Sequence, residues 1–538
     1  MEVLDTIISK VGILNKMSES VKTNLTFCVN GAFIGEKVLS IYNLSKENKV
    51  VFVASDQIEY LEVKESLENL KVDFACITTD LTPPTFSYVK NESWQAETIS
   101  NLYNFAYNSC NILLINSHTL LYKFHSKLNK NNYLKLNIKQ KINMQEIINN
   151  LILNGYKKCQ KIEKIGDFTV KGDILDVYLN NYISPIRIDF FDDEIDNIYE
   201  YDLSEMQKTN TLNELIILPN KMYNFNDDQK QQILANLKTA IVGTNINGDA
   251  LVKIHTLISQ ITNGILDGVI DSDIDFVLPF VKEEYHLYEL LPEAKFIISS
   301  PKRIYDDLQD EYKSVSASIY DFVQSGELLL EHQNFYFSIE QTLNFKPAIV
   351  FSNSTQNIFR CDITDNLRTI GARNYVFDYK SMLNDLFIYE RSNYKIIMFA
   401  GNKQSKQTIG EFLTKYNIFY SDELKNNNKF QVIISEEKFN KSCSFWDAGI
   451  IIFGTDDLIK KTASQVKNLS SKNKKRNAFY LPKVGEYVVH TTHGIGKCVA
   501  LTKMNLNGTE KDYFVIEYAG GDKLYLPSEQ ADLISAYM

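Results

Sequence analysis

Apolar residues along the first 115 positions recur alternately with the spacing of helices and of strands. In chain order this pattern predicts a helix over residues 6–17, a strand over 25–29, a helix over 36–44 and a strand over 50–54. A short apolar run at 111–115 has the composition of a strand that is buried on both faces. Helices and strands in alternation are typical of a parallel α/β sheet. We therefore predict an α/β domain whose first part covers residues 1–115.

The period of the pattern changes to two between residues 116 and 216. Apolar and polar residues alternate in four segments, 168–170, 174–178, 186–191 and 195–201. Such segments, separated by turn residues, predict three or four antiparallel strands in a domain at 116–216. Asp192 and Asp193, with Glu194 and Asp196, loosely resemble a calcium loop, but the run lacks the regular alternation and the terminal Glu. We interpret it as a hairpin turn.

Helical spacing returns over residues 217–345, with a strand at 296–298 and a helix after Ser300. We assign this range to the second part of the first α/β domain. Residues 346–455 repeat the α/β alternation and predict a second, small α/β domain. Its expected elements are strands over 394–399, 430–435 and 449–453 and a helix over 408–415.

The last part of the chain has two different compositions. Residues 456–483 are rich in Lys, Ser and Asn and poor in apolar residues, which indicates a basic linker. Residues 484–538 contain short apolar segments between glycines, a pattern that predicts a small β-barrel of about five strands. The predicted fold class is thus multidomain, α/β and α+β, with an inserted antiparallel domain and a C-terminal barrel.

Composition adds limits on the kind of protein this is. The 538 residues are 44% hydrophobic and 23% charged, which is typical of a globular protein with several domains. The net charge of -10 argues against a surface that binds nucleic acid throughout. For the basic run 472–476 two interpretations stay open, a weak contact with DNA phosphates and a solubilising linker.

Cysteine usage and hydropathy indicate the compartment. The seven cysteines are scattered and form no Cys-x-x-Cys pair, as expected for reduced thiols. No stretch of about 18 apolar residues occurs, and the first residues mix charged with apolar positions. We therefore expect a cytoplasmic protein without a signal peptide, a membrane span or a membrane partner.

A phosphate-binding loop requires the pattern Gly-x-x-x-x-Gly-Lys-Ser/Thr, and residues 31–38 come nearest to it. Gly31 and Lys37 fit. Glu36 stands at the second glycine position, where it would place an anion beside the phosphates, and Val38 replaces the hydroxyl that holds magnesium. The sequence predicts a degenerate phosphate loop that opposes ATP binding.

Other catalytic and metal-binding patterns are also incomplete. Asn116 and Ser117 follow the strand at 111–115, where helicases carry an acidic pair for magnesium. His490 and His493 are three residues apart, but without a Cys or acidic partner we favour a role in a turn over zinc binding. We expect no catalytic residue, no metal site and no cofactor in this chain.

Two segments near the end carry a resemblance to a known family. They are VGEYVVHTTHGIGK from Val484 and DYFVIEYAGGDKLYLP from Asp512. Both closely resemble the RNA polymerase-interaction domain of bacterial transcription-repair coupling factors, a CarD-like, Tudor-like small barrel. The resemblance implies that an exposed strand edge pairs with the polymerase β subunit. By position in the motif, the polymerase contact falls on Met504, beside Thr502 and Lys503; an ordinary place in the barrel is the alternative for Met504.

Two further segments resemble the module that these factors share with the repair protein UvrB. They are GDFTVKGDILDVY from Gly166 and RIDFFDDEI from Arg187. In the family this module docks on UvrA through two basic residues and one aromatic residue, which fall here on Lys171, Arg187 and Phe191. Lys171 stands where Arg is usual, so we expect that contact to be weaker. The degenerate phosphate loop also matches the family's UvrB-like α/β domain.

The resemblance implies the adaptor part of such a factor, which binds stalled polymerase and recruits UvrA for nucleotide excision repair. Family members continue into ATP- and magnesium-dependent motor domains, which would also make the main DNA contacts. Because those domains are expected after the barrel, we interpret the end at Met538 as a truncation or a split gene. Two alternatives remain: a CarD-type transcription regulator without a repair role, and a UvrB-like ATPase or helicase, against which Glu36 and Val38 count.

Overall fold

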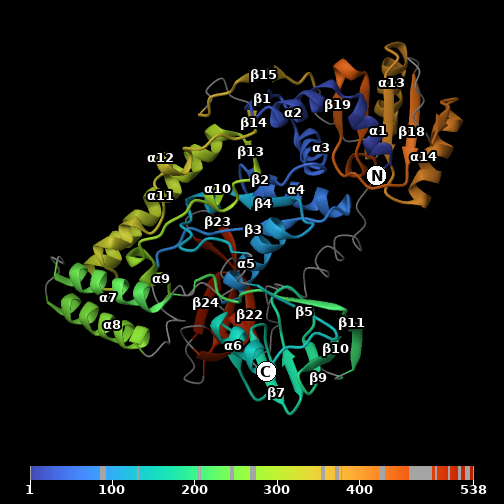
Figure 1. Cartoon of the computed structure of the whole chain (residues 1–538). Coiled ribbons are helices and arrows are strands. Elements are labelled where there is room, and N and C mark those ends of the chain that lie inside the picture. The colour runs from blue at the N-terminus through green and yellow to red at the C-terminus, as the bar shows by residue number, and fades with distance from the viewer. Residues whose placement is uncertain are drawn as a thin grey trace. The chain divides into compact units, whose positions relative to one another are not determined.

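A computed structural model provides the structure of the chain (Figure 1). It describes residues 2–84, 92–129, 133–203, 205, 207–223, 225–242, 248–266, 274–352, 358–369, 375–376, 378–422, 430–459, 487–490, 494–506, 509–518, 523–527 and 534–536. The chain divides into two compact units, Met1–Ile459 and Lys460–Met538. We describe each unit by itself.

The first unit is built around a parallel sheet of seven strands in the order β15-β1-β14-β13-β2-β4-β3. In chain order the strands are β1 (Phe27–Asn30), β2 (Val50–Ala54), β3 (Ala75–Ile77), β4 (Ile112–Asn116), β13 (Lys295–Ser299), β14 (Ile349–Ser352) and β15 (Ile363–Asn366). Successive residues of β2 enter opposite cores: Val51 and Val53 enter one, and Phe52 enters the other. The sheet is therefore buried on both faces, as its near-continuous apolar strands predicted.

Helices cover both faces of this sheet. The core on one face contains residues of α1 (Glu2–Lys10), α2 (Gly12–Lys22), α3 (Ile34–Ser45) and α4 (Gln57–Asn69). The core on the other face contains residues of α5 (Glu92–Tyr107), α7 (Asp227–Val242), α8 (Asp249–Leu266), α9 (Ile274–Val277), α10 (Leu287–Leu290), α11 (Pro301–Gln324) and α12 (Ile339–Thr342), with the short 3-10 turns η2 (Ser117–Leu121) and η4 (Leu278–Phe280). Leu329 and Phe335, on either side of the 3-10 turn η5 (Leu330–Asn334), belong to the same core. In Figure 1, α7 and α8 lie side by side at one end of α11.

The predicted single helix over residues 6–17 is wrong, because the chain breaks at Val11 into α1 and α2. Val11 has extended backbone angles, with φ -92° and ψ 103°, and caps the start of α2. Its side chain is nevertheless buried, as are Ile7, Leu14 and Met17 on either side of it. The apolar spacing therefore continues across the break, which hides it from the sequence pattern.

A second layer of the same unit is a sheet in the order β17-β18-β16-β20-β19. Its strands are β16 (Lys395–Phe399), β17 (Tyr420–Ser421), β18 (Gln431–Ser435), β19 (Cys443–Phe445) and β20 (Ile450–Phe453), with η6 (Trp446–Ala448) and α15 (Thr455–Leu458) beside them. One face packs under α13 (Tyr379–Arg391) and α14 (Lys403–Lys415). The other face shares a core with α1 to α4. Those four helices are thus enclosed between two sheets.

The range 116–216 forms a mostly antiparallel sheet in the order β11-β10-β9-β8-β7-β6. The strands are β6 (Lys157–Lys158), β7 (Asp167–Lys171), β8 (Ile174–Val177), β9 (Ile186–Phe191), β10 (Glu194–Tyr201) and β11 (Lys208–Thr211). One face buries an apolar core with α6 (Met144–Leu153) and with the separate pair β5 (Leu134–Asn137) and β12 (Glu214–Ile217). The hairpin turn predicted at Asp192 is confirmed: its φ is 56°, and Phe191 pairs with Glu194 across the turn.

The second unit contains an antiparallel sheet in the order β24-β23-β22-β21-β25. The strands are β21 (Tyr487–His490), β22 (Gly494–Leu506), β23 (Thr509–Glu517), β24 (Lys523–Pro527) and β25 (Ile534–Ala536). About five short strands were predicted. Five strands are described, but β22 and β23 are longer than expected, with 13 and 9 residues. Within the described part of this unit, no pairing closes the sheet between its edge strands β24 and β25, so a closed barrel stays a prediction.

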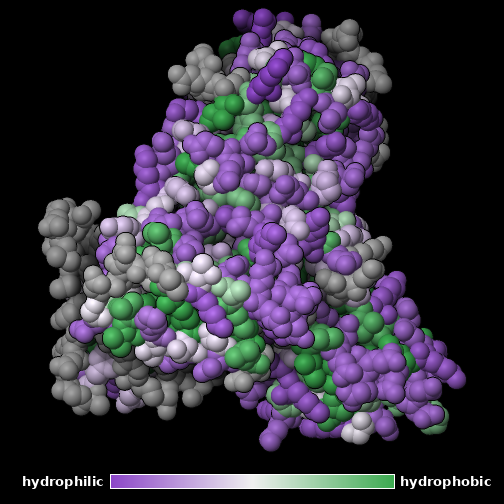
Figure 2. Space-filling view, turned by 60° about the vertical axis from the view of Figure 1, so that its left-hand side comes forward, coloured by the Kyte–Doolittle hydropathy of each residue, from purple (hydrophilic) through white to green (hydrophobic). Residues whose placement is uncertain are grey.

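The confirmed fold class is a mixed α/β protein with several sheets, one of them parallel. Hydrophilic residues prevail on the face in Figure 2, and hydrophobic residues form smaller groups among them. The seven cysteines, all of which lie in described parts of the chain, are thiols that form no disulfide. Among the helices described, none is long and apolar enough to cross a membrane. The basic run 472–476 and His493 lie outside the described residues.

Candidate functional sites

The degenerate phosphate loop connects β1 to α3. Gly31 follows β1 with a φ of 85°, and a Cβ here would lie 2.9 Å from the carbonyl oxygen of Leu367. Both the backbone conformation and the lack of space therefore require glycine. Val38 is buried in the core beneath α3. It is a packing residue at the position where an active loop carries a hydroxyl.

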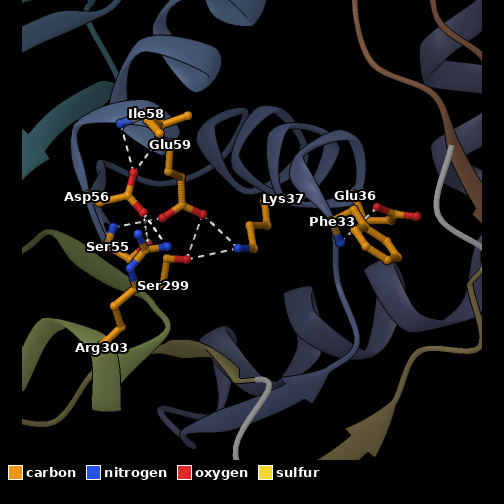
Figure 3. Close-up of polar contacts among 9 residues, drawn as sticks. All are labelled: Phe33, Glu36, Lys37, Ser55, Asp56, Ile58, Glu59, Ser299 and Arg303. Atoms are coloured by element: carbon orange, nitrogen blue, oxygen red, sulfur yellow. Dashed lines mark hydrogen bonds and ion pairs between the residues drawn. The ribbon is translucent and has the colours of Figure 1, made fainter. Parts of the chain in front are cut away.

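Lys37 has an internal carboxylate partner (Figure 3). Its Nζ lies 2.6 Å from Oε1 of Glu59 and 2.9 Å from Oγ of Ser299. Ser299 donates to the same Oε1 at 2.7 Å, and the backbone N–H of Ser55 donates to Oε2 of Glu59 at 2.7 Å. Burial opposes ionisation of Glu59, but the charge and hydrogen bond of Lys37 outweigh it and lower the pKa of Glu59. The ammonium that a phosphate would need is already neutralised.

Glu36 points away from Lys37, on the other side of α3 (Figure 3). Its Oε2 accepts from the backbone N–H of Phe33 at 3.1 Å. Its Oε1 accepts from Oγ1 of Thr369 at 2.7 Å and from the N–H of Ser444 at 3.1 Å. The carboxylate caps α3 and joins it to β19, instead of facing Lys37 as an anion in a shared phosphate site.

Gly35 explains how β19 comes so close to α3. A Cβ at this position would lie 2.8 Å from Cβ of Cys443 and 2.8 Å from the carbonyl oxygen of Ser442. Glycine is needed because the carbonyl oxygens of Lys441 and Ser442 and the Cβ of Cys443 cover the first turn of α3. In a working phosphate loop that turn directs its amides at the ligand.

The pKa of Glu36 is raised above its ordinary value of 4.5, because burial disfavours the charged form more than the surrounding donors favour it. The folded state then holds a proton that the unfolded state has lost, so this group's contribution to stability falls as pH rises from 4.5 through the raised pKa. Glu36→Gln removes this dependence of the free energy of unfolding on pH. It also turns an amide NH2 toward one of the donors, at a cost of about 1–3 kcal/mol.

We therefore expect Glu36→Gln to be less stable than wild type at acidic pH, and the deficit to shrink as the pH rises. Urea denaturation of both proteins across that pH range measures the difference, and all other titrating groups cancel in it. A deficit that grows with pH would contradict the raised pKa of Glu36.

Asn116 is the last residue of β4, Ser117 follows it, and their polar groups are used internally. Asn116 accepts from the N–H of Thr79 at 3.1 Å and donates to its carbonyl oxygen at 2.8 Å. Thr119 donates to Asn116 at 2.6 Å, and Ser117 donates to Asp307 at 3.4 Å. The two Asn116–Thr79 bonds hold β4 and the turn after β3 together, and the Ser117 bond joins the turn after β4 to α11. Within the described ranges, no cluster of His, Cys, Asp or Glu is arranged to hold a metal ion.

The three residues that the resemblance implies for UvrA lie on one face of the six-stranded sheet. Ile188 and Phe190 of β9 point into the apolar core, so Arg187 and Phe191 point to the opposite face. Val170 packs against the same core, which places Lys171 on the outer face as well. The face opposite the core therefore carries all three side chains.

The three side chains differ in how they are held. Lys171 is exposed at the end of β7. Phe191 is 79% exposed, which is unusual for an aromatic residue. Arg187 is half-buried and forms a two-bond ion pair with Asp176, whose Oδ1 lies 2.6 Å from Nε and whose Oδ2 lies 2.9 Å from Nη2. Asp176 was not singled out from the sequence.

The residues implied for polymerase binding lie on β22. Thr502, Lys503 and Met504 pair with Tyr513, Asp512 and Lys511 of β23. Thr502 is half-buried, whereas the described structure of Lys503 and Met504 is limited to the backbone. His490 ends β21 opposite Gly494.

Other residues that sequence analysis missed are Glu59, Ser299, Thr369 and Ser444. Each reaches the phosphate loop from a distant part of the chain, and Ser299 is 262 positions from Lys37. Only the packing of β13, α4, β19 and the segment after β15, which contains Thr369, brings them to α3. For Asp176 a signal existed, because a charged residue between Leu175 and Val177 on a half-buried strand must face outward.

Comparison with known proteins gives two matches to family models. Residues 134–223 match the UvrB interaction domain. Residues 483–538 match the CarD-like/TRCF RID domain.

Curated relatives are transcription-repair-coupling factors. The one from Bacillus subtilis is 23% identical over 427 residues, which are 76% of this chain and 36% of the relative. The one from Borreliella burgdorferi is 26% identical over 556 residues, which are 100% of this chain and 45% of the relative. The one from Staphylococcus haemolyticus is 22% identical over 432 residues, with coverage of 76% and 36%. The chain spans less than half the length of these relatives.

The resemblance seen in the sequence is thus confirmed: over most of its length the chain is related to the bacterial transcription-repair-coupling factors, and it contains their UvrB interaction and CarD-like domains.

Proposed function

We propose that this chain acts as the adaptor part of a transcription-repair coupling factor. It binds stalled RNA polymerase, at the β subunit, through residues 484–538, and it recruits UvrA through residues 116–216. The observation that carries the proposal is the presence of a UvrB interaction domain and a CarD-like domain in one chain. Either domain alone fits a repair protein or a transcription regulator; a protein that couples the two processes needs both.

The outer face of the six-stranded sheet supports the UvrA part of the proposal. An exposed Phe191 on the same face as two basic side chains offers an apolar anchor and polar contacts, as in many protein interfaces. For polymerase, the proposal uses Thr502, Lys503 and Met504 on β22 of a sheet that closes into a small barrel. The long β22–β23 hairpin supports recognition through strand pairing.

The proposal assigns no ATPase to residues 1–459. Lys37 is paired with Glu59, Val38 is packed in the core, and the segment 441–443 covers the first turn of α3. These contacts oppose the alternative of a UvrB-like ATPase, and ATP and magnesium belong to the motor domains of the family. Micromolar ATP binding by this chain in a calorimetric titration would revive that alternative.

The test is a pull-down with purified UvrA and with the polymerase β subunit as separate baits. We expect the Arg187→Ala/Phe191→Ala double variant to lose UvrA and keep polymerase. We expect Met504→Arg to lose polymerase and keep UvrA, because a charge replaces an apolar contact. Each variant thus serves as the other's control.

The possible failures separate the alternatives. A wild-type chain that binds polymerase and not UvrA would favour a CarD-type regulator without a repair role. A wild-type chain that binds neither bait would contradict the adaptor function.

A further inference from the structure

Arg187 is fixed by its neighbours before any partner arrives. Arg187 and Asp176 are directly opposite each other in the antiparallel pair of β9 and β8. Their two hydrogen bonds, at 2.6 and 2.9 Å, join parallel edges of the guanidinium and the carboxylate. The Asp176 side chain is only 7% exposed, and that of Arg187 is 22% exposed. Water therefore competes weakly for this pair.

An aromatic ring holds the guanidinium from another direction. The guanidinium carbon of Arg187 lies 5.1 Å from the centre of the Tyr201 ring, within range of a cation–π contact. Tyr201 is buried at the end of β10. Its backbone N–H donates to the carbonyl oxygen of Pro185 at 3.1 Å, beside the start of β9. The ring is thus anchored to the strand that carries Arg187.

This arrangement limits what Arg187 can offer to a partner. A guanidinium has five N–H donors, and Asp176 takes two of them, on Nε and Nη2. The remaining donors are those of Nη1 and the second N–H of Nη2. Tyr199, which is opposite Arg187 on β10, also hydrogen-bonds the Arg187 side chain, so fewer than three donors stay free for a partner. Asp176 also balances the positive charge. Arg187 therefore contributes directed hydrogen-bond donors more than net charge.

We propose that Asp176 and Tyr201 are positioning residues, which hold the free edge of Arg187 in place for UvrA. The inference rests on the proposed function and goes beyond the three contact residues of the family. An Arg side chain that is already ordered loses less conformational entropy on binding than a mobile one. The partner surface that fits this edge presents single oxygen acceptors beside an apolar pocket for Phe191.

A double-mutant cycle on the whole chain tests the proposal. UvrA affinity is measured for wild type, Asp176→Asn, Arg187→Ala and the double variant. We expect Asp176→Asn to weaken binding roughly tenfold, equivalent to about 1.4 kcal/mol, and to have no further effect once Arg187 is alanine. Asp196→Asn is the matched control. Asp196 also pairs with a cation, Lys139 at 2.7 Å, on the same sheet, but Arg187 takes no part in that pair.

Tyr201 provides a second variant in case Asp176→Asn fails to fold. We expect Tyr201→Leu to weaken UvrA binding several-fold, because the ring face is lost. We expect Tyr201→Phe to bind as wild type, because the ring remains. Thermal melting of each variant is measured alongside.

Three outcomes would overturn the inference. If wild type binds UvrA and Asp176→Asn binds equally well, Asp176 has no positioning role. If Asp176→Asn weakens binding equally with and without Arg187, its effect is a general disturbance of the sheet. If wild type does not bind UvrA, the proposed function fails first, and the inference fails with it.

Discussion

Replacing Glu59 with alanine is expected to reduce the free energy of unfolding of the first unit by about 3–5 kcal/mol. The Glu59 and Lys37 side chains are 6% and 7% exposed. Removal of the carboxylate leaves a buried ammonium whose nearby hydroxyl, Ser299, cannot balance its charge. The N–H of Ser55 loses its acceptor as well. This is the change for which we expect the greatest loss of stability.

Urea denaturation followed by tryptophan fluorescence measures this effect. The chain has two tryptophans, and one of them, Trp446, donates to Ser444 at 3.1 Å, next to the Glu36 contact. Glu62→Ala is a matched control from the same face of α4. Glu62 also pairs with a lysine, Lys441 at 2.7 Å, but both side chains are about one-third exposed. We expect that control to cost less than about 1 kcal/mol.

Replacing both members of the buried pair distinguishes charge from packing. Lys37→Met combined with Glu59→Leu leaves no buried charge, and we expect it to be more stable than Glu59→Ala alone. An equal cost for Glu59→Ala and Glu62→Ala would show that the buried pair carries no special weight. The Lys37–Glu59 pair would then contribute little to the packing of α3 against α4 and β13.

The sequence predicted the parts of the fold that depend on short-range patterns. Strand β2 was expected over 50–54 and lies at Val50–Ala54, because a run of five apolar residues fits a strand that is buried on both faces. The turn at Asp192 was found because both flanking strands alternate. The break at Val11 was missed because a buried apolar residue at that position fits a continuous helix equally well.

In the candidate sites too, features that depend on short-range patterns were predicted, and features that depend on tertiary packing were not. Motif position indicated Lys171, Arg187 and Phe191, and strand alternation then puts them on one face. The partner of Arg187 depends on the register of β8 and β9, whose connection covers residues 178–185 and is too long for a tight turn to fix the register. The sequence placed Glu36 beside the phosphates. Its actual contacts with Thr369 and Ser444 lie 333 and 408 residues away, and only tertiary packing determines them.

Phe191→Ala is expected to weaken UvrA binding by about 2–4 kcal/mol, equivalent to roughly 30- to 1000-fold in affinity. The ring is 79% exposed, so it contributes little to the fold, and its area becomes buried only when a partner covers it. We therefore expect the free energy of unfolding to change by less than about 0.5 kcal/mol. A loss of binding without a loss of stability separates a contact residue from a structural one.

Ile183→Ala is the matched control for this measurement. Ile183 is 73% exposed and belongs to the same domain, but it lies in the connection between β8 and β9 and not on a strand of the sheet. Titration of UvrA into each variant should show wild-type affinity for Ile183→Ala and a large loss for Phe191→Ala. If both variants bind like wild type, UvrA does not use this face. If both variants lose affinity equally, UvrA recognises exposed apolar side chains anywhere on the domain, because Phe191 and Ile183 are similarly exposed but lie at different positions.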